Sequence, residues 1–214
     1  ARIVLPSELR NEIARLEIED QATAGGVALI DERWRRRPVG LVSQTSFSES
    51  QPLLSELHYL DQALSPFSEV RRGPLEGLLQ RELAVILLPD SGTLSAPERT
   101  ALRGWVEAGG VLLRFAGPIL AAADPSDEAL IPVPLRQGGR LLGGALSWSQ
   151  PARLAAFPPE SPFAGLAIPP DVAVQRQVLA QPALDLAERS WATLEDGTPL
   201  VTAARLGEGW VALV

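Results

Sequence analysis

Five residues that could take part in chemistry follow three apolar runs of the sequence. They are Ser43, Gln44, Asp90, Ser91 and Gly117. If the runs are parallel strands of an open sheet, these residues meet at its carboxyl edge, where such folds usually bind ligands. The carboxylate of Asp90 suits a metal ion or a ligand hydroxyl, although a lone carboxylate makes a poor Mg²⁺ site. Asp-Ser-Gly also favours a simple turn before a helix, and this interpretation has the stronger support.

Catalytic side chains are scarce in this chain. It contains no cysteine and one histidine, His58. These counts exclude disulfides, thiolate metal sites and cysteine catalysis. His58 stands beside Tyr59 and Leu60 on an expected helix, which indicates a structural residue rather than a base. We therefore predict no catalytic residue, no metal site and no cofactor.

A second group of residues is typical of protein interfaces. It consists of Trp34, Arg35, Arg36 and Trp148. Tryptophan and arginine dominate the binding energy of many interfaces, so these residues are candidates for contact with a partner. The alternatives are a solvated arginine cluster and ordinary packing of the two tryptophans.

The overall composition limits the possible partners. The net charge is −7, which argues against a nucleic-acid-binding protein because such a protein needs a basic face. Hydrophobic residues make up 46% of the chain, as in a folded globular protein. No apolar run approaches the ~20 residues that span a bilayer.

The elements that must position these residues alternate between strands and helices. Residues 39–43 and 83–90 form almost entirely apolar runs, typical of strands buried on both faces of a parallel sheet, and residues 111–116 return as a further strand. Ser95 precedes Glu98 by three residues, which is the spacing of a capping box at a helix start. This strand–helix–strand order predicts a right-handed βαβ unit, and hence a mainly parallel sheet with helices on both faces.

The two ends of the chain differ from this pattern. Residues 200–205 and 210–214 predict an antiparallel hairpin at one edge of the sheet. Residues 1–37 predict a small β appendage or linker, because Leu16 and Ile18 alternate with glutamates. A helix from Ser7 to Leu16 is the alternative. The expected division is thus residues 1–37 and an α/β domain of residues 38–214.

The segments LLPDSGTLSAPERTALRGWVEAGGVLLRFAG and DGTPLVTAARLGEGWVALV resemble non-catalytic members of the class I glutamine amidotransferase-like family. This resemblance implies a flavodoxin-like α/β fold for residues 38–214. The segments VALIDERWRRRPVGLVS, LGGALSWSQPARLAAF and SPFAGLAIPPDVAVQRQVLA look like the region after the second membrane span in proteobacterial double-transmembrane proteins, which are related to the Bat aerotolerance group. That likeness implies a membrane-anchored bacterial parent with this part in the periplasm, attached through flanking segments.

The resemblance also locates a missing nucleophile. Catalytic amidotransferases carry a cysteine at a tight strand-to-helix turn, and the matching positions here are Ala116 and Gly117. Neither side chain can attack a carbonyl. The predicted function is therefore a non-catalytic binding or scaffold domain, which contacts neighbouring domains of the same membrane protein or another protein. The alternative is a small-ligand-binding or hydrolytic domain that uses the crevice at Asp90 and Gly117.

Overall fold

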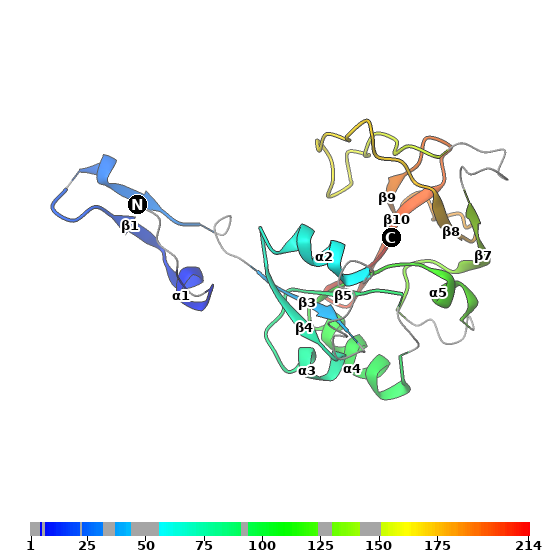
Figure 1. The fold of residues 1–214 in the computed structure, drawn as a ribbon, viewed down its shortest axis with the longest axis horizontal. Coiled ribbons are helices and arrows are strands. Elements are labelled where there is room, and N and C mark those ends of the chain that lie inside the picture. The colour runs from blue at the N-terminus through cyan, green and yellow to red at the C-terminus, as the bar shows by residue number, and fades with distance from the viewer. Residues whose placement is uncertain are drawn as a thin grey trace.

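The computed structural model describes residues 5, 7–21, 23–31, 37–43, 56–90, 94–123, 130–141 and 151–214. Within these residues, the largest element is a seven-stranded sheet with the order β4-β3-β5-β6-β11-β10-β9 (Figure 1). Its strands are β3 (Pro38–Val42), β4 (Glu69–Gly73), β5 (Val85–Leu88), β6 (Val111–Arg114), β9 (Ser190–Thr193), β10 (Pro199–Leu206) and β11 (Gly209–Leu213).

The sheet is mixed rather than parallel throughout. β4, β3, β5, β6 and β11 run parallel to one another, whereas β10 is antiparallel to both β11 and β9. The apolar runs of β3 and β5 lie in its interior and are almost entirely buried. Because a central strand meets side chains on both faces, both sides of these strands are apolar.

Short helices cover the two faces of this sheet, as Figure 1 shows. On one face, α2 (Glu56–Leu64) packs leucines 57, 60 and 64 against a cluster around Val39, Leu41 and Leu87. On the other face, α3 (Leu75–Leu79) and α4 (Ala96–Glu107) enclose the larger core cluster, which includes Ile86, Leu102 and Val106.

The start of α4 confirms the predicted capping box. The Ser95 hydroxyl accepts a hydrogen bond from the Glu98 amide at 3.4 Å, and the Glu98 carboxylate accepts one from the Ser95 amide at 2.9 Å. These bonds satisfy two amide groups that have no partner within the helix.

The predicted hairpin of residues 200–205 and 210–214 forms between β10 and β11. A two-residue turn joins them, in which Gly207 has φ of 60°, a conformation that favours glycine. The hairpin does not lie at the edge of the sheet, because β11 pairs with β6 and β9 forms the edge. A small sheet of β7 (Leu135–Leu141) and β8 (Arg176–Ala180) packs beside α5 (Pro118–Ala122).

The predicted flavodoxin-like α/β fold class is wrong, although the sheet does have helices on both faces and parallel pairing from β4 to β11. After β6 the described chain forms a single helix, α5, which has five residues. Apart from β11, which is parallel to β6, the other described residues of this part build antiparallel strand pairs, isolated bridges and turns. Antiparallel strands need no crossover helix, and so the second half of the chain adds strands without adding helical layers.

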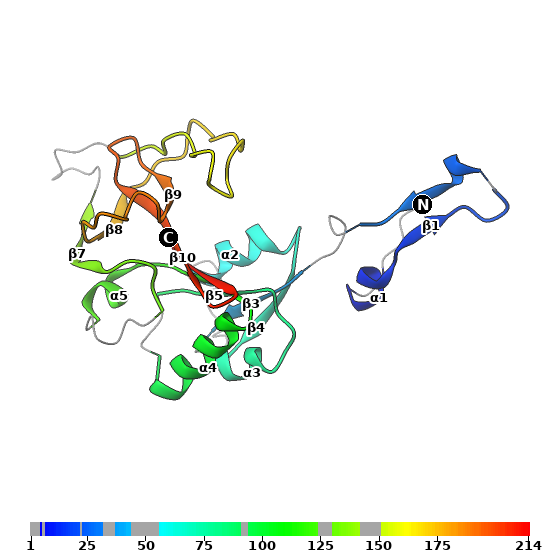
Figure 2. The same cartoon turned by 180° about the vertical axis from the view of Figure 1, so that it is seen from behind.

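The N-terminal residues combine both alternatives that the sequence left open. A six-residue helix, α1 (Ser7–Glu12), precedes an antiparallel pair of strands, β1 (Arg15–Glu17) and β2 (Val27–Leu29), and the 3₁₀ turn η1 (Ala24–Gly26) leads into β2. Figure 2 shows this N-terminal arm, which comprises the described residues 5, 7–21 and 23–31, extending away from the large sheet. In the part of the chain that the structure describes, no helix combines the length and apolar character that crossing a membrane requires.

Candidate functional site

At the predicted crevice, where β5 and β6 end, the side chain of Asp90 bonds to the start of α5. Asp90 follows β5, and α5 begins just after the exit of β6. The Ile119 amide donates a hydrogen bond to Asp90 Oδ2 at 2.9 Å, and the Leu120 amide donates one to Oδ1 at 2.8 Å. Both carboxylate oxygens therefore satisfy amides in the first turn of α5, which have no partner within the helix.

Gly117 is required here by the close approach of Asp90. Its φ of −147° is extended and open to any residue, so the backbone conformation does not demand a glycine. A Cβ at this position, however, would collide with the Asp90 carboxylate. The structure thus brings together two of the five predicted crevice residues, and it does so through a structural contact.

The remaining groups at the exit of β6 also make internal bonds. The Ala116 amide donates to the Val214 carbonyl at 2.7 Å, which joins this exit to the end of β11. The guanidinium of Arg114 donates to the Leu130 carbonyl at 3.3 Å. The strand-to-helix corner is thus built from contacts within the chain itself.

The other predicted residues fall in three places. Ser43 directly follows β3, and its amide donates to the Gly73 carbonyl at the end of β4 at 2.9 Å. His58 is half-buried on α2 with its ring edge-on to Tyr59. Six candidate residues lie outside the described residues: Gln44, Ser91, Trp34, Arg35, Arg36 and Trp148.

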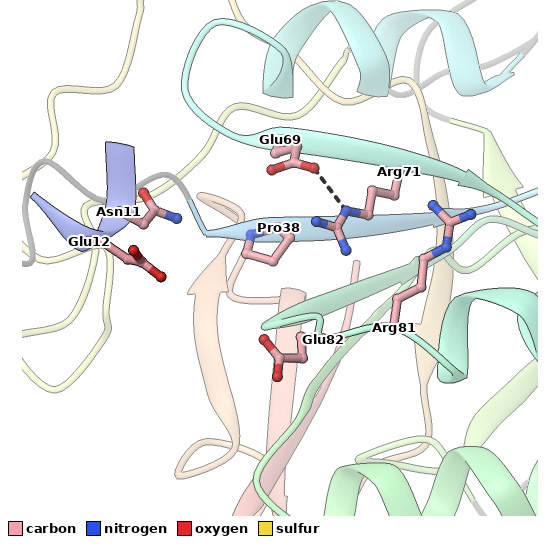
Figure 3. Close-up of a pocket in the computed structure, with 7 residues that line it drawn as sticks. All are labelled: Asn11, Glu12, Pro38, Glu69, Arg71, Arg81 and Glu82. Carbon is pink, nitrogen blue, oxygen red and sulfur yellow. Dashed lines mark hydrogen bonds and ion pairs between the residues drawn. The ribbon is translucent and has the colours of Figure 1, made fainter. Parts of the chain in front are cut away.

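A groove of about 750 Å³ lies at the opposite edge of the sheet, where β3 and β4 begin. Figure 3 shows its lining, with α1 on one side and the large sheet on the other. The lining residues are Asn11, Glu12, Pro38, Glu69, Arg71, Arg81 and Glu82. We call this feature the amino-edge groove.

The chemistry of the amino-edge groove suits binding. Its described lining residues present three carboxylates, two guanidinium groups and one amide, and none of these residues is a serine, cysteine or histidine. Arg71 Nε donates to Glu69 Oε1 at 2.9 Å, which fixes one pair of opposite charges on the wall formed by β4. Such a mixed surface can pair with both signs of charge on a polypeptide.

Sequence reasoning missed this groove because it considered only the residues that follow strands. The available signal was the set of charged residues at the beginning of strands, such as Glu69 and Arg71 in the segment EVRR. Arg81 and Glu82 likewise precede the apolar run of β5. Among the residues that the structure describes, no three His, Cys, Asp or Glu side chains are grouped so that they could hold a metal ion.

No family model matches the chain, and no curated protein matches its sequence. Its structure is similar to cytoplasmic protein STM3548 from Salmonella typhimurium, with 14% identity and a TM-score of 0.54, over 83% of this chain and 86% of that protein. It is also similar to part of a β-galactosidase from Rahnella sp. R3, with 14% identity and a TM-score of 0.54, over 84% of this chain. A β-galactosidase from Bacillus circulans sp. alkalophilus gives 12% identity and a TM-score of 0.53, over 82% of this chain.

These likenesses concern the fold. The chain spans 29% of the Rahnella enzyme and 28% of the Bacillus enzyme, so it corresponds to a part of each. The likeness to segments of β-galactosidases replaces the flavodoxin-like class that the sequence suggested. None of these similarities bears on the resemblance to the double-transmembrane proteins, which stays a prediction.

Proposed function

We propose that this chain is a non-catalytic binding or scaffold domain that contacts a neighbouring domain of the same protein or another protein. The main support is the pair of hydrogen bonds that Asp90 accepts from Ile119 and Leu120. A carboxylate that caps a helix with both oxygens is committed to structure, which argues against a catalytic role for Asp90.

The amino-edge groove is the proposed contact surface. Its carboxylates and guanidinium groups fit a polypeptide segment that carries charges of both signs. Trp34, Arg35, Arg36 and Trp148, which lie outside the described residues, remain predicted contact residues. Because the resemblance implies a membrane-anchored parent, the proposal places this binding in the bacterial periplasm. A fusion to alkaline phosphatase, which is active only outside the cytoplasm, tests that location.

Photo-crosslinking in living cells tests the binding function. The full-length protein carries p-benzoyl-phenylalanine in place of Glu82, and in a matched control in place of the exposed Glu107 on α4. We expect a defined protein adduct from position 82 only, and a lower yield after Arg81→Glu. Equal adducts from both positions, or none from position 82, would contradict the groove as the contact surface.

Hydrolysis of a β-galactoside is the second candidate function, and the fold likeness to parts of β-galactosidases supports it. A chromogenic β-galactoside incubated with the purified chain gives the test. We expect no turnover above buffer. Turnover that is lost in a folded Asp90→Asn variant would favour the hydrolytic function and overturn the scaffold proposal, since asparagine retains a capping oxygen but no charge.

A further inference from the structure

The N-terminal arm has an apolar face that nothing in the described structure covers. The register pairs Leu16 with Ala28, and alternation along the strands adds Ile18 and Ile30 to the same face. Leu16 is 47% exposed and Ile18 is 57% exposed. No apolar side chain that the structure describes within residues 7–31 is buried. An isolated two-stranded hairpin of this kind is only marginally stable in water.

The arm also has an unpaired strand edge. The Ile30 amide donates to the Ala14 carbonyl at 2.9 Å, and the Ile18 amide donates to the Gly26 carbonyl at 2.8 Å. Since the backbone groups of alternate residues point to opposite sides of a strand, Arg15 and Glu17 direct their amides and carbonyls away from β2. Among the described residues, β1 has no strand partner other than β2.

The charges on β1 are complementary to a second copy of β1. Arg15 and Glu17 share one face of the strand and form an ion pair, with Arg15 Nη2 3.4 Å from Glu17 Oε2. Their side chains are 66% and 58% exposed. In an antiparallel pairing centred on Leu16, each Arg15 stands opposite the Glu17 of the other copy. Centring the pairing on residue 15 or residue 17 would instead place like charges opposite each other, which is destabilising.

We propose that this chain self-associates through β1, edge to edge and antiparallel, about a two-fold axis at Leu16. The outward backbone groups of Arg15 and Glu17 then meet those of Glu17 and Arg15 in the second copy. Two hydrogen-bonded pairs form, and the two hairpins become one four-stranded sheet in the order β2-β1-β1-β2. Such a sheet exceeds the three strands that an independently stable unit needs.

The proposed dimer contact is small. It falls below the roughly 1,600 Å² that a standard stable interface buries, and so association is weak and depends on concentration. The contact is independent of the amino-edge groove function, because that function involves no β1 residue.

Sedimentation of the whole 214-residue chain over a hundredfold concentration range tests the proposal. The wild type gives a monomer–dimer equilibrium. Arg15→Glu and Glu17→Arg each replace two attractive pairs with two repulsive ones, and each raises the dimer dissociation constant at least about tenfold. The double variant Arg15→Glu/Glu17→Arg restores opposite charges and returns the constant towards that of the wild type. A mixture of the two single variants forms a heterodimer.

Matched controls separate this contact from general charge effects and misfolding. Arg103→Glu and Glu107→Arg make the same charge changes in an exposed pair on α4, and they leave the dimer constant unchanged. If the double variant recovers the wild-type dissociation constant, the loss of dimer in the single variants cannot be due to misfolding. A wild type that stays monomeric at every concentration overturns the proposal, as do single variants that associate normally or a double variant that does not recover.

Discussion

The side chain of Asp90 shows how a residue that suits chemistry can instead complete a fold. Its two bonds reach amides 29 and 30 positions further along the chain. Sequence patterns for helix caps act within about three residues, so they cannot reveal a cap that arrives from a neighbouring strand. The pattern Asp-Ser-Gly suggested a turn before the next helix at position 90, whereas the bonds of Asp90 to α5 became visible only in three dimensions.

Because Gly117 makes room for Asp90, the two positions should be energetically coupled. Asp90→Ala should lower the free energy of unfolding by about 2 kcal/mol through loss of two charge-assisted bonds. Gly117→Ala should cost more in the wild type than in Asp90→Ala, where the collision is gone. Urea denaturation of the wild type, the two single variants and the double variant measures this coupling. Asp171→Ala, at an exposed position, is the control. Additive costs would show that the two positions do not interact.

At the scale of elements, the sequence was informative wherever one local signal decided the structure. The apolar run at 39–43 became β3, the run at 111–116 became β6, and the Ser95–Glu98 spacing marked the start of α4. The secondary structure of the N-terminal arm was harder to predict. The spacing of Leu9, Ile13 and Leu16 fits a helix, whereas alternation at Leu16 and Ile18 fits a strand. Both occur there in succession, which periodicity alone cannot resolve.

The capping box of α4 should make part of its stability depend on pH. The Ser95 hydroxyl, and then the Ser95 amide, bond to the Glu98 carboxylate and hold its pKa below the ordinary 4.5. A depressed pKa contributes stability above the ordinary value, and this contribution is lost as the pH falls through the depressed one. Ser95→Ala should therefore cost about 1 kcal/mol at neutral pH.

The cost of Ser95→Ala should shrink as the solution is acidified to about pH 3.5. Urea denaturation at both pH values measures the difference. Thr100→Ala is the control, because it removes a hydroxyl from the same helix that bonds a backbone carbonyl and no titrating group. A cost that is unchanged or larger in acid would contradict the role of ionised Glu98.

At the scale of the whole molecule, strand order escaped sequence reasoning. The pattern of residues 200–214 predicted the hairpin but placed it at an edge, whereas β11 lies between β6 and β10. Which strands become neighbours is decided by packing between distant segments, such as the contact of Val211 with the core around Leu102 and Leu112. Local periodicity carries no information about such contacts.

Amide hydrogen exchange should be faster before the predicted boundary near residue 37 than in the large sheet after it. β1 and β2 are exposed along their whole length, so their amides should exchange by local opening. β5 and β11 should exchange only through global unfolding, because both lie inside the large sheet. Mass spectrometry of peptides from each region, at low protein concentration, measures the difference. Equal protection in β1 and β5 would show that the arm is part of the main cooperative unit.

The central position of β11 has a consequence for the nascent chain. β3, β4, β5 and β6 all leave the ribosome before residues 209–213, and until then the free edge of β6 has no partner. The growing polypeptide therefore carries an open, apolar strand edge, the kind of surface that associates with other unfinished chains. The sheet can therefore close between β6 and β10 only after residues 209–213 have been made.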